Sequence, residues 1–195
     1  MPLCRFRVKP PPRAILEIAI VAPLISFPST HATAQGLVPS RAFVQAASGP
    51  RTDALMGGLT WDWRYKYDLG AGVVTGYWDL AVGRWRSKVE GGGSESAWVS
   101  QLGITPVFRY QPSESSDLFL ELGIGANLIA PVYRSERKSF STVFNFGDHL
   151  AVGWKFGQRR SHEIALRIQH FSNAGIKHPN PGENFLQLRY SWELN

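Results

Sequence analysis

The feature that most constrains the fold is an alternation of apolar with polar or small residues, sustained over segments of about ten residues. The segment 118–128 shows it clearly: its even positions hold Leu, Ile and Ala, while Glu, Gly and Asn follow one another at the odd positions from 121 to 127. The segment 55–65 alternates in the same way, with Leu, Gly and aromatic residues on one parity. Successive side chains of a strand point to opposite faces, so this period predicts β-strands with one apolar face.

The length of these segments favours a membrane barrel over a soluble sandwich. A strand that crosses the hydrocarbon core of a bilayer at a tilt needs roughly ten residues. Every backbone polar group in lipid must be paired, which forces the sheet to close. Aromatic residues near the segment ends are typical of membrane interfaces, as at Trp61, Trp63, Tyr65, Trp98 and Tyr110. We therefore predict an all-β fold, an eight-stranded antiparallel transmembrane β-barrel of the outer membrane.

The eight strands are predicted at 41–49, 54–67, 71–85, 97–110, 117–130, 141–156, 162–172 and 183–194. One end of the barrel would carry mostly long connections, at 50–53, 86–96, 131–140 and 173–182. The other end would carry short turns, at 68–70, 111–116 and 157–161. Long outer loops and short periplasmic turns are the usual asymmetry of such barrels, so the last long loop is expected to face the outside.

Residues 1–34 are predicted to be a cleaved signal peptide, which leaves 35–195 as the barrel domain. A basic start precedes an apolar run at 14–27, and Ala32-Thr33-Ala34 supplies the small-x-small pattern before a cleavage site at Gln35. The alternative, an amphipathic N-terminal helix, fits less well because the run is short. Removal of four basic residues and one acidic residue lowers the net charge from +6 to +3. An exported chain with so small a charge is not expected to bind nucleic acid.

Three polar side chains fall on the face that should contact lipid. The apolar parity of the segment 162–172 continues to His170 and then to Ser172. With the turn at 157–161, Asp148 of the preceding strand lies opposite His170. Polar groups on a lipid face cost free energy unless they have a use, so a function is expected here. The alternative is that His170 and Ser172 only begin the polar outer rim.

A serine, a histidine and a carboxylate together are the parts of a serine esterase. A serine becomes a nucleophile when a base takes its proton. An imidazole can take that proton and return it to a leaving alcohol. A third group orients the imidazole, and N–H donors stabilise the oxyanion that forms. Because this site opens to lipid, its substrate is expected to be an ester in the outer leaflet.

The residues around this pair resemble a known signature. The segment His170-Phe171-Ser172-Asn173-Ala174-Gly175-Ile176-Lys177, followed by Asn180-Pro181-Gly182-Glu183-Asn184, is similar to that of the PagL-type lipid A 3-O-deacylases. These outer-membrane enzymes remove the acyl chain esterified at position 3 of lipid A. Phe146-Gly147-Asp148-His149 resembles another segment of that family. The match is specific over about 25 residues, and elsewhere the resemblance is one of architecture.

The resemblance implies a role for each residue of the signature. His170 corresponds to the general base and Ser172 to the nucleophile. Asn173 and Asn180 correspond to residues that hold the oxyanion or shape the loop, with the backbone N–H of the residue at 174 or 175 as a further donor.

The acid that orients the histidine is less directly implied. The family has a Glu in the strand after this loop, and Glu183 is the carboxylate closest to that place. Strand parity puts Asn184 outside instead, so Glu183 would need a bulge beside Gly182 to reach His170. Asp148 and Asn184 are therefore the alternative orienting residues.

We thus expect a serine esterase that hydrolyses the 3-O-linked acyl chain of lipid A in the bacterial outer membrane. Its partner would be lipid A or lipopolysaccharide, and neither a cofactor nor a metal is expected. His149, His162 and His178 do not have the spacing of metal ligands. Two rivals stay open, a non-enzymatic small barrel with a structural or adhesion role and a different lipid enzyme such as a phospholipase. The sequence also leaves open whether the barrel works as a homodimer.

Overall fold

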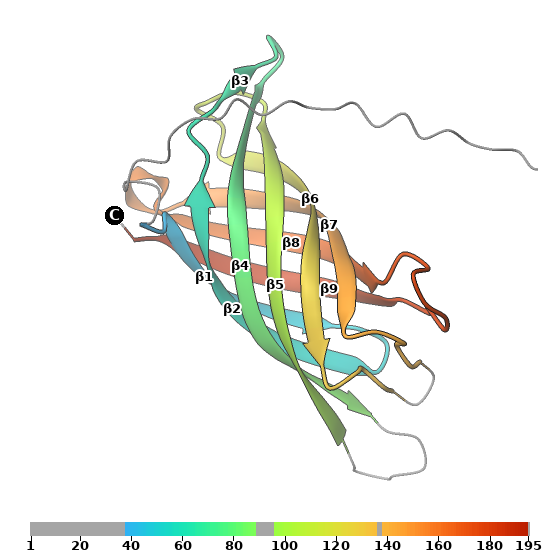
Figure 1. Ribbon diagram of the computed structural model, residues 1–195. Helices are drawn as coiled ribbons and strands as arrows, with labels where there is room; N and C mark the ends of the chain where they lie inside the picture. Colours follow the sequence, from blue (N-terminus) through green and yellow to red (C-terminus); the bar gives the residue numbers. More distant parts are fainter. Residues whose placement is uncertain (1–37, 89–95, 136–137, 195) are drawn as a thin grey trace, which may run out of the picture. The chain divides into compact units, whose positions relative to one another are not determined.

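The computed structural model describes residues 38–88, 96–135 and 138–194 (Figure 1). The predicted signal peptide and its cleavage site lie outside these ranges. Across them, no helix has both the length and the apolar character needed to cross a membrane. The elements are β1 (Arg41–Ser48), β2 (Thr52–Asp62), β3 (Tyr67–Asp68), β4 (Val73–Lys88), β5 (Ser96–Gln111), β6 (Leu118–Ala130), β7 (Phe144–Phe156), the 3₁₀ turn η2 (Gln158–Arg160), β8 (His162–Ser172) and β9 (Glu183–Glu193).

These strands form one closed antiparallel barrel. From β4 to β9 each strand pairs with the next in the chain, β2 pairs with β1 and β4, and β1 closes the ring by pairing with β9. The two-residue strand β3 pairs with the start of β4 and lengthens the β2–β4 hairpin beyond the ring. Eight strands make the wall, which confirms the predicted eight-stranded antiparallel barrel.

The strand bounds differ most from the prediction in the β2–β4 hairpin. β2 ends at Asp62 rather than at 67, and β4 continues to Lys88 instead of 85. Just past the end of β2, the Trp63 ring lies directly over Gly76, where an added Cβ would stand 2.1 Å from a ring carbon. The backbone N–H of Trp63 donates to the Gly76 carbonyl at 2.8 Å. Regular pairing of β2 with β4 thus ends at Asp62, one residue before the Trp63 ring packs on its partner strand.

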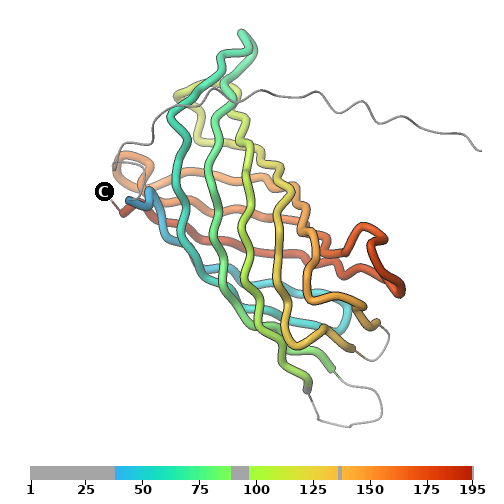
Figure 2. Tube along the Cα trace, in the orientation of Figure 1, coloured from blue at the N-terminus to red at the C-terminus, as the bar shows by residue number. Residues whose placement is uncertain are grey.

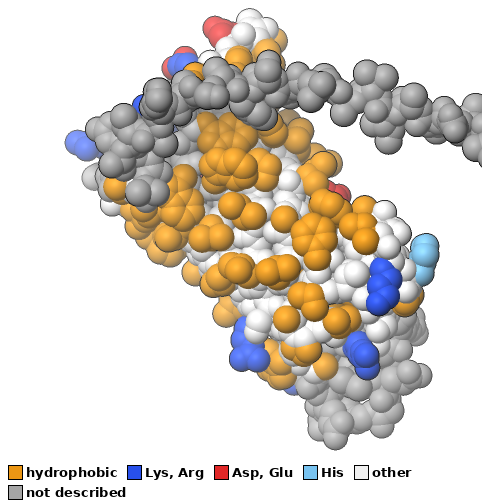
Figure 3. Space-filling model, viewed as in Figure 1, with side chains coloured by type: hydrophobic (Ala, Val, Ile, Leu, Met, Phe, Trp, Pro, Cys, Tyr) orange, Lys and Arg blue, Asp and Glu red, His pale blue; other side chains and the backbone are white. Residues whose placement is uncertain are grey.

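The two faces of the wall have opposite chemistry. Along β6 every second residue is exposed, and the exposed set is aliphatic, as at Ile124, which is 64% exposed. The alternate positions face the lumen and include charged residues such as Glu121, which is 3% exposed. Figure 3 shows hydrophobic side chains over the middle of the wall, with Lys and Arg side chains near its lower end. This pattern is the one that a lipid-facing barrel requires.

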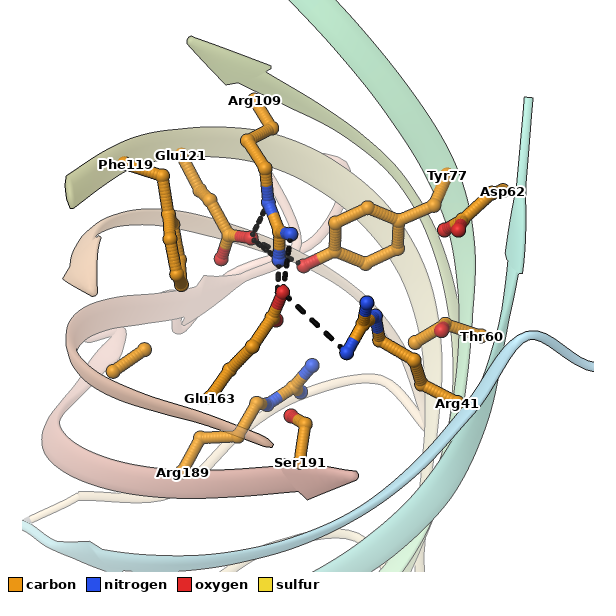
Figure 4. A pocket seen from close by; sticks show the side chains of 11 residues that line it. Arg41, Thr60, Asp62, Tyr77, Arg109, Phe119, Glu121, Glu163, Arg189 and Ser191 are labelled. Carbon is orange, nitrogen blue, oxygen red and sulfur yellow. Dashed lines mark hydrogen bonds and ion pairs between the residues drawn. The ribbon is translucent and has the colours of Figure 1, made fainter. Parts of the chain in front are cut away.

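Charged side chains fill the lumen rather than line a channel (Figure 4). Arg109 bridges two carboxylates, with N···O distances of 2.7 Å to both Glu121 and Glu163. Beside them, the Arg189 guanidinium lies 2.6 Å from the Asp79 carboxylate. The cavity that these side chains enclose measures about 10 Å³, roughly the space of one water molecule. At this level the lumen is therefore filled by charged side chains.

We call the end of the barrel with the β6–β7 loop (131–143) and the β8–β9 loop (173–182) the long-loop end. Figure 2 shows the two loops at the same end of the barrel, and hydrogen bonds join them. Inside this end the Trp85 ring packs on Tyr133, Phe171 and Phe185, with centroids 4.8 to 5.5 Å apart. This aromatic cluster closes the lumen beneath the loops and gives them a rigid base.

Candidate active site

His170 and Ser172 lie on the outer face of β8, at the long-loop end. Both side chains are half-buried, while Phe171 between them is buried in the lumen. The β7–β8 register places Asp148 opposite His170, and Asp148 is exposed on the same outer face. The predicted outward placement of these three residues and the predicted cross-strand pair are confirmed.

Asn184 lies opposite His170 on the other side, in β9, and its amide contacts the imidazole. The His170 Nδ1 atom is 2.6 Å from the Asn184 Oδ1 atom. An amide oxygen only accepts, so Nδ1 carries the hydrogen in this arrangement and Nε2 is left as the acceptor. Asn184 therefore stands where the third member of a serine–histidine–acid arrangement orients the histidine.

The structure contradicts the predicted placement of Glu183 beside His170. Regular pairing of β9 with β8 extends to the Phe171–Glu183 pair, and the expected bulge beside Gly182 does not turn the side chain outward. Glu183 is 2% exposed, and its carboxylate accepts a hydrogen bond of 2.8 Å from the Tyr133 hydroxyl inside the lumen. Because successive side chains of a strand alternate between its two faces, Glu183 points into the lumen and Asn184 points to the outer face.

Gly182 lets the chain pass close to the imidazole at the start of β9. Its φ is +62°, in the left-handed region that favours glycine. A Cβ at this position would lie 2.4 Å from Cε1 and 3.1 Å from Nε2 of His170. The absence of a side chain here therefore keeps the edge of the imidazole free on its Nε2 side.

Asn173 shapes the loop that follows Ser172. Its side-chain amide donates to Ser141 Oγ at 2.9 Å, to Thr142 Oγ1 at 3.2 Å and to the Lys177 carbonyl at 2.8 Å. Its Oδ1 accepts from the Gly175 backbone N–H at 3.0 Å. Asn173 is 1% exposed, and its contacts favour a role in shaping the loop over a role in binding an oxyanion. Its partners at 141 and 142 belong to the other loop, whereas the sequence predicted that a strand begins at 141; β7 begins only at Phe144.

A backbone N–H donor lies close to Ser172, and a neighbouring amide side chain is fixed by the same loop. The Ala174 backbone N–H points at the Ser172 hydroxyl oxygen, with an N···O distance of 3.4 Å. Ala174 has a φ of +53°, a turn conformation that aims this N–H back toward the strand end. Asn180 accepts from the Asn173 backbone N–H at 3.0 Å through Oδ1. That contact fixes the Asn180 side chain through its oxygen, and its NH₂ group carries the two hydrogen-bond donors.

An apolar groove runs along the outer wall next to these residues. It has a volume of about 640 Å³ and is lined mainly by outward aliphatic and aromatic side chains of β4 to β9. Leu150, Ile168 and Leu186 are among its lining residues. Each lies two residues from a polar residue on the same face of its strand: Leu150 from Asp148, Ile168 from His170 and Leu186 from Asn184. The polar patch therefore lies next to an apolar surface of the outer wall.

The fold defines a class of protein, an eight-stranded β-barrel of the outer membrane. The sequence model described as lipid A 3-O-deacylase (PagL) matches residues 55–193. The chain belongs to this family.

Individual relatives agree with this assignment. The lipid A deacylase PagL of Pseudomonas aeruginosa is 33% identical over 181 residues, which cover 91% of this chain and 97% of the relative. Lipid A deacylase PagL of Bordetella bronchiseptica is 38% identical over 96 residues, covering 49% of this chain and 51% of the relative. A crystal structure of the outer membrane enzyme PagL superposes with a TM-score of 0.64 at 31% identity, covering 78% of this chain and 99% of that one.

Proposed function

We propose that this protein is a serine esterase of the outer membrane that hydrolyses the acyl chain ester-linked at position 3 of lipid A. The observation that carries the proposal is the His170–Asn184 hydrogen bond on the outer wall, with Ser172 two residues further along the same face. The family name, which describes lipid A 3-O-deacylases, supplies the substrate class.

In the first step Ser172 Oγ attacks the ester carbonyl carbon. His170 Nε2 takes the hydroxyl proton as the new C–O bond forms, and the carbonyl oxygen becomes an oxyanion. Collapse of the tetrahedral intermediate breaks the bond to the sugar oxygen, which receives the proton from His170. The products of this step are the deacylated lipid and an acyl group esterified to Ser172.

In the second step water replaces the sugar alcohol. His170 Nε2 takes a proton from the water as its oxygen attacks the acyl carbon. Collapse then returns the proton to Ser172 Oγ and releases the fatty acid. The enzyme is regenerated and the net reaction consumes one water for each ester cleaved.

The oxyanion needs donors within about 3 Å of the place where its charge develops. The Ala174 backbone N–H, 3.4 Å from Ser172 Oγ in the resting site, is one donor in the proposed arrangement. The Asn180 NH₂ group is the second, since its own oxygen is already used by the Asn173 backbone.

Asn184 takes the orienting role in this mechanism in place of Glu183. Its Oδ1 accepts from Nδ1–H and holds the tautomer in which Nε2 is the base. A neutral amide supplies no charge to offset the imidazolium formed during the reaction. Asp148, exposed on the neighbouring strand opposite His170, is the carboxylate nearest in register that can supply it.

Product analysis with purified protein tests the proposal against its rivals. We expect the folded barrel in detergent to release a fatty acid from lipid A that carries a 3-linked chain, and none from phosphatidylethanolamine. His170→Gln should abolish release, whereas His178→Gln, at an exposed loop position, should not. Cleavage of the phospholipid instead would indicate another lipid enzyme, and cleavage of neither would favour a non-enzymatic barrel.

A further inference from the structure

Glu183 is adjacent in sequence to Asn184 but points into the lumen, so the two side chains share one short stretch of backbone. Oε2 of Glu183 accepts from the Tyr133 hydroxyl at 2.8 Å, and Oε1 lies 3.4 Å from Lys138 Nζ. Oε1 also accepts from the backbone N–H of Asn184 at 3.3 Å. The Glu183 carboxylate thus links the β6–β7 loop directly to the residue that contacts His170.

At its first residues β9 pairs with a neighbouring strand on one side only. Pairing of β9 with β1 stops at Leu186, while pairing with β8 continues to Glu183. At Asn184 the backbone is therefore held by β8 and by the Glu183 carboxylate. Consecutive Cα atoms are about 3.8 Å apart across a planar peptide, so a displacement of Glu183 is passed to Asn184 with little loss.

Tyr133 is a rigid anchor for this contact. Its side chain is 0% exposed, and its ring packs edge-on against Trp85 and Phe140. Burial raises the pKa of Tyr133 to about 12, so the hydroxyl stays protonated and donates to the carboxylate. Thr52 Oγ1, 2.6 Å from the same hydroxyl, then donates to it and completes the chain of hydrogen bonds.

Resting on the proposed function, we infer that Tyr133 and Glu183 are positioning residues for the reaction: from inside the lumen they fix the start of β9 so that Asn184 holds His170 in its working tautomer. Neither residue touches the substrate side of the wall, since both are buried in the lumen. The effect passes through the backbone of one strand from its inner face to its outer face.

Tyr133→Phe tests this link, because it removes the hydroxyl and keeps the ring in the aromatic cluster. The matched control is Tyr77→Phe, since the Tyr77 hydroxyl also donates to a buried lumenal carboxylate, Glu121, at 2.8 Å. We expect kcat to fall about tenfold in Tyr133→Phe with little change in KM, as for a small displacement of a catalytic group. Tyr77→Phe should leave kcat unchanged. Glu183→Gln, which keeps an acceptor for Tyr133, should retain most of the activity, and Glu183→Leu should lose it.

Nitrogen NMR of histidine-labelled protein gives a readout that does not depend on activity. In the wild type His170 should be protonated at Nδ1, and in Tyr133→Phe it should become a mixture of the two neutral tautomers. An unchanged His170 tautomer and kcat in Tyr133→Phe, or the same loss in Tyr77→Phe, would overturn the inference. If the wild type cleaves no lipid ester, the proposed function fails, whereas the tautomer comparison still decides whether the lumenal link positions His170.

Discussion

His170 and Asn184 face each other across β8 and β9 on the outside of the barrel, with Nδ1 of the imidazole 2.6 Å from Oδ1 of the amide. Each belongs to a strand whose hydrogen bonds fix the separation, and Ser172 follows on the same face. A neutral amide therefore stands in this chain where the family resemblance led us to expect a carboxylate. The consequences for activity can be measured directly.

Substitution of Asn184 should change both the rate and its pH dependence. Asn184→Leu removes the acceptor for Nδ1–H, so we expect kcat to fall by roughly a hundredfold or more. Asn184→Glu keeps an acceptor and adds a charge that favours the protonated imidazole. Since the mechanism needs His170 neutral as a base, the acidic limb of the pH–rate profile should move to higher pH in this variant. The profile of kcat/KM against pH for the three proteins checks this.

An unchanged profile in Asn184→Glu, with full activity in Asn184→Leu, would show that Asn184 does not orient His170.

Gly182 should tolerate no side chain. Gly182→Ala places a Cβ 2.4 Å from Cε1 of His170, so the imidazole must move and activity should fall by about a hundredfold. Gly175→Ala is the matched control, because Gly175 also has a positive φ, +81°, but a Cβ there meets nothing within 4 Å. Both variants carry a similar backbone strain of about 1–2 kcal/mol. Equal activity loss in the two variants would attribute the effect to strain in the loop and not to contact with His170.

The lumenal charges should determine stability and not catalysis. Arg109→Met leaves the carboxylates of Glu121 and Glu163 without their shared guanidinium, so we expect a loss of about 3–5 kcal/mol in the free energy of unfolding. Lys66→Met breaks an ion pair with Glu114 whose side chains are 50% and 67% exposed, and it should cost at most about 1 kcal/mol. Urea unfolding in lipid vesicles measures both. A small effect of Arg109→Met would mean that the remaining lumenal groups, Arg41 and Arg167 among them, pair the two carboxylates sufficiently.

The sequence predicted the wall of the barrel well because one rule, the two-residue alternation, operates along every strand. The same rule put His170 and Ser172 outside, and the short β7–β8 turn gave the register that pairs Asp148 with His170. It also pointed to Asn184 rather than Glu183. The preference for Glu183 came from the family resemblance and required a bulge that the regular pairing at Phe171–Glu183 leaves no room for.

The parts that the sequence did not predict lie in the loops. The contacts of Asn173 with the loop at 141–142 and of Glu183 with Tyr133 join segments more than 30 residues apart. The strand predicted at 141–156 begins only at Phe144, and the contacts depend on how two loops pack over the aromatic cluster. In the hairpin of β2 and β4 the alternation continues past Asp62, where the regular pairing ends and the Trp63 ring packs on Gly76.

The role of Ser172 is the central claim, and mass spectrometry of lipid A from an outer-membrane host tests it most directly. The host should express the wild type, Ser172→Ala and, as control, Ser100→Ala, which changes another outward serine of the wall, in β5. Each protein is first shown to be folded in the membrane. We predict that the wild type and Ser100→Ala remove the acyl chain at position 3 and that Ser172→Ala removes none. Deacylation by Ser172→Ala at the wild-type level would contradict the account.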